Sequence, residues 1–200
     1  MTPSERAQLE AQLRSTFDAG DLRATATAAI RGYGPELYGF LVGLTHDPDA
    51  AGDVFAASCE KLWQGLATFR WDGTLRAWAF TITRHQFYQW SRGRDRRRRA
   101  VPLSDAPLSA AVEQVRSTTA LHLRTEVKDA FARLRAGLAP DDQLLLHLRL
   151  DAMAWRDIAR VLVDADAPAP DARAVAALRK RYERLKAELR AQARAQALVP

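Results

Sequence analysis

Residues 74–99, TLRAWAFTITRHQFYQWSRGRDRRRR, hold the pattern on which the fold and the chemistry of this chain both depend. Leu75, Trp78, Ala79 and Ile82 recur at three- and four-residue steps, which predicts a helix with one apolar face. Five aromatic side chains lie on this helix, and six arginines follow between residues 92 and 99. Arginine neutralises phosphates, and aromatic faces stack on bases removed from a duplex. The stretch therefore predicts a protein that opens or holds DNA.

The length and composition of the chain restrict the kind of protein it can be. The chain has 200 residues, 48% of them hydrophobic, which is enough for a real core in one domain or two small ones; we expect two. A formal net charge of +6 favours an anionic partner. Cys59 is the only cysteine, which excludes an internal disulfide and a Cys-rich zinc site. No segment looks like a signal peptide or a membrane span, so we expect a cytoplasmic protein without membrane insertion.

Upstream of this stretch the pattern is also helical. Pro35 is expected at the first position of a helix that runs to about residue 45. Asp47 is the predicted N-cap of the next helix, with Pro48 at its first position. The charged residues of 36–60 are all acidic, and an apolar stripe runs through 51–66. Thr74 is the predicted N-cap of the aromatic helix.

Downstream of it, residues 101–119 contain Pro102 and Pro107 and little sustained periodicity, so we interpret them as a flexible linker. Helical periodicity resumes near residue 121. A short helix, MAWRDIARVLV, is followed by the break DADAPAPD and a long basic helix from about Ala172, which makes a helix-turn-helix candidate. The predicted fold is all-α, with two small helical domains joined by the linker, the C-terminal one a helix-turn-helix.

In the order of these elements the chain resembles bacterial RNA polymerase sigma factors of the extracytoplasmic-function class. The first half matches at 37–45, at Asp47-Pro48-Asp49, at Leu62, Trp63 and Phe69, at 75–78 and at the arginine run. The second half matches at 138–150, at Trp155 and at 178–182. The resemblance implies an N-terminal helical extension at 1–32, a region-two-like domain at 33–100, the linker at 101–119 and a region-four-like domain at 120–200. It also implies that the linker threads through the polymerase, and a solvated tether is the alternative.

By the same resemblance, the acidic helix binds the coiled coil of the polymerase. The family commonly has an acidic residue, Gln and Glu where this chain has Gly52, Ala56 and Ala57. The interface is therefore expected either to be weaker or to use Glu60 and Lys61 instead. The expected polymerase-binding residues are Asp53, Ala56, Ala57, Glu60, Lys61 and Trp63.

The loop at 69–74 resembles the family's pocket for a flipped base of the minus-ten element. Trp71 is the expected stacking face, and Phe69 is expected either there or in the core. Trp78 is expected in the core. The run Arg96, Arg97, Arg98 and Arg99 is expected either to bind the duplex backbone or to be a solvated helix end. The expected contacts to the melted strand are Phe69, Arg70, Trp71, Asp72, Gly73, Thr74, Arg76, Arg84, Tyr88 and Arg92.

The long basic helix resembles the one that reads the minus-thirty-five element. Arginine pairs bidentately with guanine in the major groove, and further cations anchor phosphates. Two features depart from the family: Ala154 replaces a capping Ser or Thr, and the turn is several residues longer. The expected contacts are Arg173, Arg179, Lys180, Arg181 and Arg184.

The function implied is promoter-specific initiation of transcription, with core polymerase and promoter DNA as partners and an anti-sigma protein as a further possible one. A helix-turn-helix regulator that does not join polymerase, or an RNA-binding helical protein, is the alternative. We expect no enzymatic activity, cofactor or metal, because the four histidines are dispersed and no phosphate-loop or zinc motif occurs. The pair Asp141-Asp142 is interpreted as favourable charge at a helix N-terminus.

Overall fold

Helices account for the architecture of the chain, as the sequence predicted. The computed structural model describes residues 1–93, 105–122, 137–163 and 169–195, and contains no strand within these ranges. The chain divides into two compact units, Met1–Leu123 and Arg124–Pro200. No helix in the described ranges is both long and apolar enough to cross a membrane.

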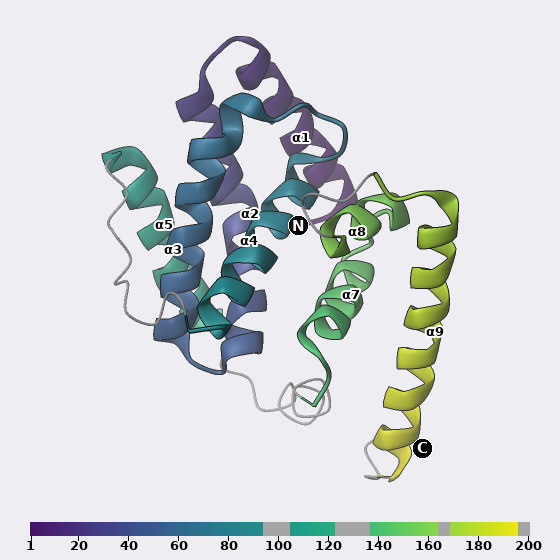
Figure 1. Ribbon diagram of the computed structural model, residues 1–200. Coiled ribbons are helices and arrows are strands. Elements are labelled where there is room, and N and C mark those ends of the chain that lie inside the picture. The colour runs from purple at the N-terminus through teal and green to yellow at the C-terminus, as the bar shows by residue number, and fades with distance from the viewer. Residues whose placement is uncertain (94–104, 123–136, 164–168, 196–200) are drawn as a thin grey trace. The chain divides into compact units, whose positions relative to one another are not determined.

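The first unit is built around α2 (Leu22–Thr45), which contacts all the other α-helices of the unit: α1 (Pro3–Asp18), α3 (Pro48–Gly65), α4 (Leu75–Ser91) and α5 (Ala106–His122) (Figure 1). A short 3-10 turn, η1 (Leu66–Thr68), follows α3. The core contains Ile30, Leu41, Phe55, Leu66 and Phe80, each at most 1% exposed. Burial of these apolar side chains is the main stabilising contribution of the unit.

Local signals set the starts of two helices. The Asp47 side chain accepts hydrogen bonds from the backbone N–H groups of Asp49 and Ala50, and Pro48 is the first residue of α3. The Thr74 hydroxyl accepts one from the N–H of Ala77 at the start of α4. Both predicted N-caps are confirmed, because capping depends only on residues close in sequence.

The predicted helix start at Pro35 is wrong. Helix α2 begins at Leu22, after the N-cap Asp21, and continues through Pro35 to Thr45. Proline removes one hydrogen bond from a helix interior. Ile30, Leu37 and Leu41 are buried on either side of it, and their packing keeps the helix continuous. The expected boundary at residue 32 therefore falls inside a helix, and residues 1–32 are part of the first unit.

The linker interpretation is wrong for residues 106–119, which belong to α5. Leu108, Ala111, Val112 and Val115 are buried at three- and four-residue steps against the first unit. Glycines make room for this helix: a Cβ at Gly34 would lie 2.8 Å from Val115 Cγ2. Pro102 lies outside the described residues, and Pro107 falls in the first turn of α5, where proline is tolerated.

The second unit contains α7 (Pro140–Leu150), α8 (Trp155–Leu162) and α9 (Ala172–Ala195). Leu145, Leu148, Ile158 and Val161 are fully buried, and Leu185 of α9 is 5% exposed. Asp141 and Asp142 lie in the first turn of α7, as interpreted from the sequence. Helix α8 has no side-chain N-cap bond, in line with Ala154 at its start. Helices α8 and α9 pack together, and their assignment as a helix-turn-helix stays a prediction.

Candidate nucleic-acid interfaces

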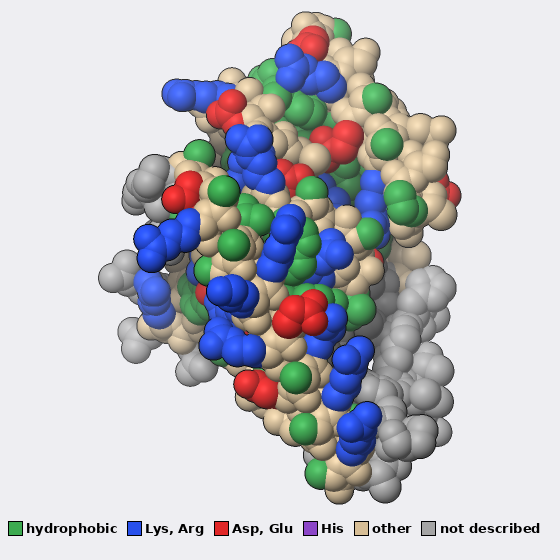
Figure 2. All heavy atoms as spheres, turned by 90° about the vertical axis from the view of Figure 1, so that its right-hand side faces the viewer, with side chains coloured by type: hydrophobic (Ala, Val, Ile, Leu, Met, Phe, Trp, Pro, Cys, Tyr) green, Lys and Arg blue, Asp and Glu red, His purple; other side chains and the backbone are tan. Residues whose placement is uncertain are grey.

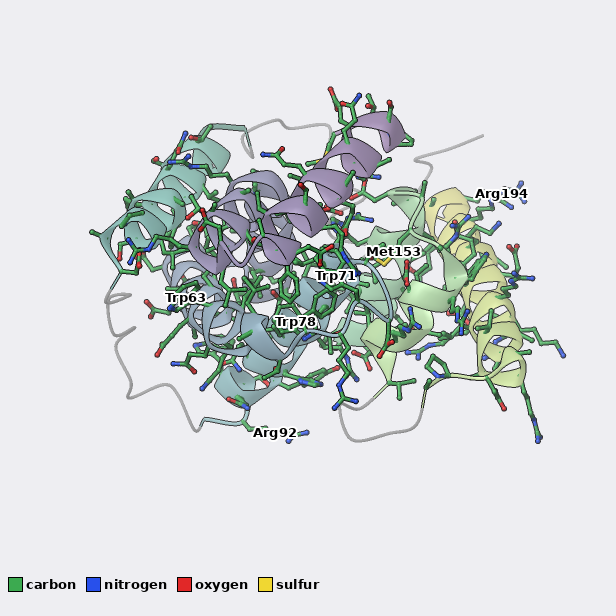
Figure 3. All side chains as sticks on the ribbon, turned by 90° about the horizontal axis from the view of Figure 1, so that it is seen from above. Trp63, Trp71, Trp78, Arg92, Met153 and Arg194 are labelled. Carbon is green, nitrogen blue, oxygen red and sulfur yellow. The ribbon has the colours of Figure 1, made fainter. Side chains whose placement is uncertain are left out.

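The loop between η1 and α4 holds a cluster of aromatic rings. Phe69 stacks on Trp78, with centroids 4.9 Å apart and planes at 25°, and its ring lies 5.0 Å from that of Trp71. Trp78 is partly exposed instead of lying fully in the core as expected. Figure 3 shows Trp71 and Trp78 near one another, beside α1. The predicted stacking residues therefore form one cluster.

Trp71 is held in an unusual backbone conformation. Its φ is 56°, in the left-handed region that bulky residues rarely adopt, at a cost of about 1–3 kcal/mol. Phe17 of α1 meets the ring edge-on at 5.5 Å, and the Arg14 guanidinium lies 5.0 Å from its centroid. The indole Nε1–H is buried and has no hydrogen-bond partner in the described part of the chain. Surrounding contacts from α1 and Phe69 hold this residue against local strain.

Glu10 of α1 binds the start of α4. Its carboxylate accepts hydrogen bonds from the backbone N–H groups of Leu75 (3.1 Å) and Arg76 (2.9 Å), where the helix dipole favours negative charge. It also accepts one from the Tyr33 hydroxyl at 2.7 Å. Burial, and then the Glu10 charge, raise the pKa of Tyr33 well above its usual range. The N-terminal helix is thus joined to the residues that follow the aromatic loop.

Arg76 was expected on an accessible face of α4, but it lies in the interior of the first unit. Its side chain is buried, and Nε lies 3.0 Å from Glu36 Oε2, with Nη2 donating to the other carboxylate oxygen. Arg76 is thus buried and paired with a residue 40 positions away, and its predicted contact with melted DNA stays a prediction that would require this pair to open.

The other candidates on α4 and its preceding loop are accessible. Arg84 and Tyr88 are partly exposed, with the guanidinium 5.2 Å from the ring centroid, and exposed Arg92 is the C-cap residue. Four-residue spacing puts these three on one helix face. Arg70 and Asp72 are exposed, while Gly73 and Thr74 are partly exposed. Arg96 to Arg99 lie outside the described residues.

The predicted polymerase-binding residues lie along the outer side of α3. Asp53 and Lys61 are exposed, and Ala56, Ala57, Glu60 and Trp63 are partly exposed. Gln64 joins the two charged residues of the last turns: it donates to Glu60 at 2.9 Å and accepts from Lys61 at 3.0 Å. Gly52 is buried and faces the Arg116 guanidinium of α5, so this departure from the family makes room for another helix.

Basic side chains gather on the exposed face of α9, as Figure 2 shows. Arg181 differs from the other candidates, because its Nε lies 2.6 Å from Asp142 Oδ1 of α7. This ion pair joins α9 to α7, and the predicted role of Arg181 in reading DNA stays a prediction. The exposed candidates are Arg173, Arg179, Lys180 and Arg184.

Trp155 connects this face to the rest of the second unit. Arg149 and Arg179 lie 4.7 and 5.8 Å from its ring centroid, and Tyr182 meets the ring edge-on at 5.6 Å. No sequence pattern predicts this contact, because its members come from three helices. The start of α8 is thereby held against α9.

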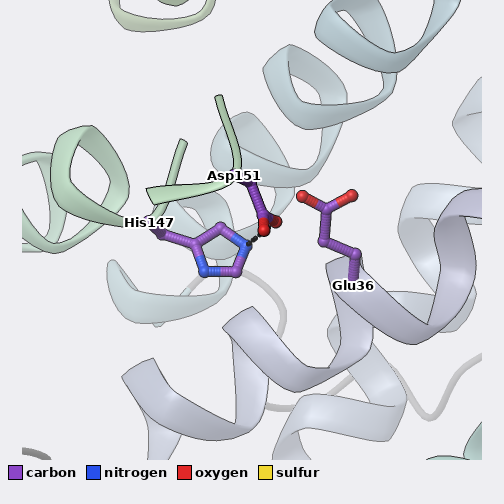
Figure 4. A group of neighbouring side chains, drawn as sticks. All are labelled: Glu36, His147 and Asp151. Carbon is purple, nitrogen blue, oxygen red and sulfur yellow. Dashed lines mark ion pairs between the residues drawn. The ribbon is translucent and has the colours of Figure 1, made fainter. Parts of the chain in front are cut away.

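A histidine and a carboxylate form a further pair in the second unit. His147 Nε2 lies 3.9 Å from Asp151 Oδ2, which is an ion pair when the imidazole is protonated (Figure 4). Glu36, also drawn there, belongs to the first unit, where it holds Arg76.

The family-model comparison matches part of the first unit. Residues 29–97 match the family model of sigma-70 region 2. The chain is also 36% identical over 62 residues to the RNA polymerase sigma factor YlaC of Bacillus subtilis (strain 168). This match covers 31% of the chain and 36% of that protein, so it spans about a third of the relative's length. No solved structure matches the chain.

Proposed function

The chain carries a sigma-70 region 2 and resembles sigma factors of the extracytoplasmic-function class, as predicted, and from this premise we propose that it directs RNA polymerase to specific promoters. The outer side of α3 binds the core enzyme. The loop at 69–74 and the outer face of α4 capture unpaired bases of the minus-ten element, and α9 reads the minus-thirty-five duplex. Polymerase supplies all the catalysis.

The observation that carries this proposal is the aromatic cluster around Trp71. Strained backbone conformations persist where the surrounding structure holds them, and they concentrate at functional sites. A partly exposed indole next to Phe69 and Trp78 offers π-faces to a base of any identity. Arg84 and Arg92 add cations on α4 that attract the phosphates of the same strand.

The chain is expected to change the conformation of the DNA and to catalyse no reaction itself. Stacking of an unpaired base is worth about 1–3 kcal/mol, which offsets part of the cost of unpairing. Duplex binding by α9 would hold the DNA in register while the loop traps bases as they open. Binding free energy thereby shifts the equilibrium from closed to open DNA.

The test is reconstitution of the full chain with core polymerase, followed by transcription from a library of genomic fragments. We expect co-purification with core and initiation at a defined set of promoters. On such a promoter, Trp71→Ala should reduce permanganate reactivity of the melted region more than recruitment. Failure to bind core, with retained binding to duplex DNA, would instead support a regulator that acts without joining polymerase.

A further inference from the structure

We propose that α1 forms part of the single-strand binding site, with Arg14 as a residue that positions Trp71 for the captured base. This inference rests on the proposed function, because it assigns a role within the same site. It gives residues 1–21 a task that the sequence did not reveal. The ligand class is an unpaired nucleotide of single-stranded DNA.

Helix α1 is seated firmly beside the loop. Leu13 is fully buried, and Leu9 fills the space next to Gly32, where a Cβ would clash with Leu9 Cδ2. Glu10 joins the same helix to the first N–H groups of α4. Because about one turn separates Glu10 from Arg14, the helix backbone at Arg14 is held in place relative to the loop.

Arg14 is oriented by a neighbour on its own helix. Its Nε donates to Asp18 Oδ2 at 2.8 Å, while the side chain remains 52% exposed. This ion pair directs the planar guanidinium over the Trp71 ring, 5.0 Å from the centroid. An arginine in such a position stabilises the ring by a cation–π contact and by planar stacking, which lysine reproduces poorly.

The two contacts from α1 act on the one residue of the loop with a strained backbone. Phe17 packs on the Trp71 ring in a T-shaped contact, Arg14 lies over the ring, and Phe69 packs against it at a tilted angle. Without them, Trp71 could relax out of the left-handed conformation and turn the indole away. Arg14 therefore affects DNA binding through Trp71, and this distinguishes it from a cation that simply attracts phosphate.

The test measures binding of the full chain to a fluorescein-labelled pool of short, random single-stranded DNA at low ionic strength. Arg14→Ala should weaken binding by about fivefold, the size of one cation–π contact, and Arg14→Lys should weaken it nearly as much. Arg31→Ala, which removes an exposed arginine from α2, is the charge-matched control and should change binding less than twofold. Thermal unfolding confirms that each variant is folded.

A double-mutant cycle with Trp71 decides the mechanism. Trp71→Ala alone should weaken binding by about tenfold, and adding Arg14→Ala should change it no further. If the two losses multiply, or if Arg14→Ala behaves like Arg31→Ala, the positioning role of α1 is refuted while base capture by Trp71 stands. If Trp71→Ala binds like wild type, or wild type fails to bind, base capture itself is refuted and the role of α1 with it.

Discussion

The guanidinium group of Arg116 lies where a side chain at position 52 would project. A Cβ at Gly52 would be 2.8 Å from Arg116 Nη2, and α5 could not dock in the same way over a large residue. Gly34 has the corresponding role opposite Val115. These two contacts explain why small residues occur on α2 and α3 at positions that face α5.

The two glycines should differ in their response to alanine. Gly34→Ala drives a methyl group against Val115, which is short and branched, and should cost about 1–3 kcal/mol of unfolding free energy. Gly52→Ala meets only the flexible end of Arg116 and should stay within about 1 kcal/mol of wild type, because alanine favours the helix. Gly39→Ala, in open space on α2, should stabilise the protein slightly. Urea unfolding measures all three, and equal losses at 34 and 52 would contradict the docking of α5.

Removal of the Glu10 carboxylate should loosen the start of α4. Glu10→Ala leaves the N–H groups of Leu75 and Arg76 without their acceptor, at a cost of about 1–3 kcal/mol. Hydrogen exchange at these two amides should accelerate, whereas exchange at the Thr74-capped amide of Ala77 should change little. Gln12→Ala, on the exposed side of α1, is the control and should leave all three rates unchanged.

Removal of one partner of the buried Glu36–Arg76 pair should destabilise the protein more than removal of both. Glu36→Leu leaves the Arg76 charge buried without this partner and should cost about 3–5 kcal/mol of unfolding free energy. The double variant Glu36→Leu/Arg76→Met removes both charges and should recover most of that loss. Denaturant titration of both proteins checks the prediction, which fails if the double variant is the less stable one.

Tyr33 should make the first unit sensitive to alkali. Its pKa in the folded protein is raised above the ordinary value of 10.0, so in the pH range above 10 the unfolded chain loses a proton that the folded chain keeps. Stability from this residue is intact below pH 10 and falls above it by about 1.4 kcal/mol per pH unit. Urea titrations between pH 9 and 11 should show a shallower fall for Tyr33→Phe than for wild type, and parallel curves would exclude Tyr33 as the cause.

Some of the neighbouring cations on α9 should affect DNA binding, and another should affect the stability of the second unit. Lys180→Ala combined with Arg184→Ala, both exposed, should weaken binding to upstream promoter duplex without changing core binding or the unfolding midpoint. Arg181→Ala should instead lower the stability of the second unit by about 0.5–1 kcal/mol, since it loses the pair with Asp142. Filter binding and thermal unfolding distinguish the two. Equal loss of stability in both variants would contradict the assignment.

Local patterns predicted much of the fold. The caps at Asp47 and Thr74 depend on residues two or three positions away, so sequence alone located them. Pro35 was misleading because proline at a helix start and proline tolerated within a packed helix look the same in sequence. The apolar spacing of α5 was present in the sequence, but two prolines dominated its interpretation.

The candidate site was less predictable, because its geometry depends on contacts between distant segments. Arg76 is paired with a residue 40 positions away, and Glu10 reaches α4 across 65. The positive φ of Trp71 depends on contacts with α1, which the sequence analysis predicted only as part of an N-terminal extension. Residue types could therefore identify the loop, whereas the side chains that hold it required the fold.

The docking of α5 also means that a partner can bind in a way that exposes apolar surface of the first unit. Any partner that draws residues 106–119 out as extended chain must expose Leu108, Ala111, Val112 and Val115 to water, and it uncovers the apolar surface of α2 beneath them. Burial of apolar surface on binding lowers the heat capacity. In such an assembly this decrease would be smaller, since the apolar area newly exposed offsets part of the area buried. Calorimetry of complex formation would therefore report whether this helix remains folded after a partner binds.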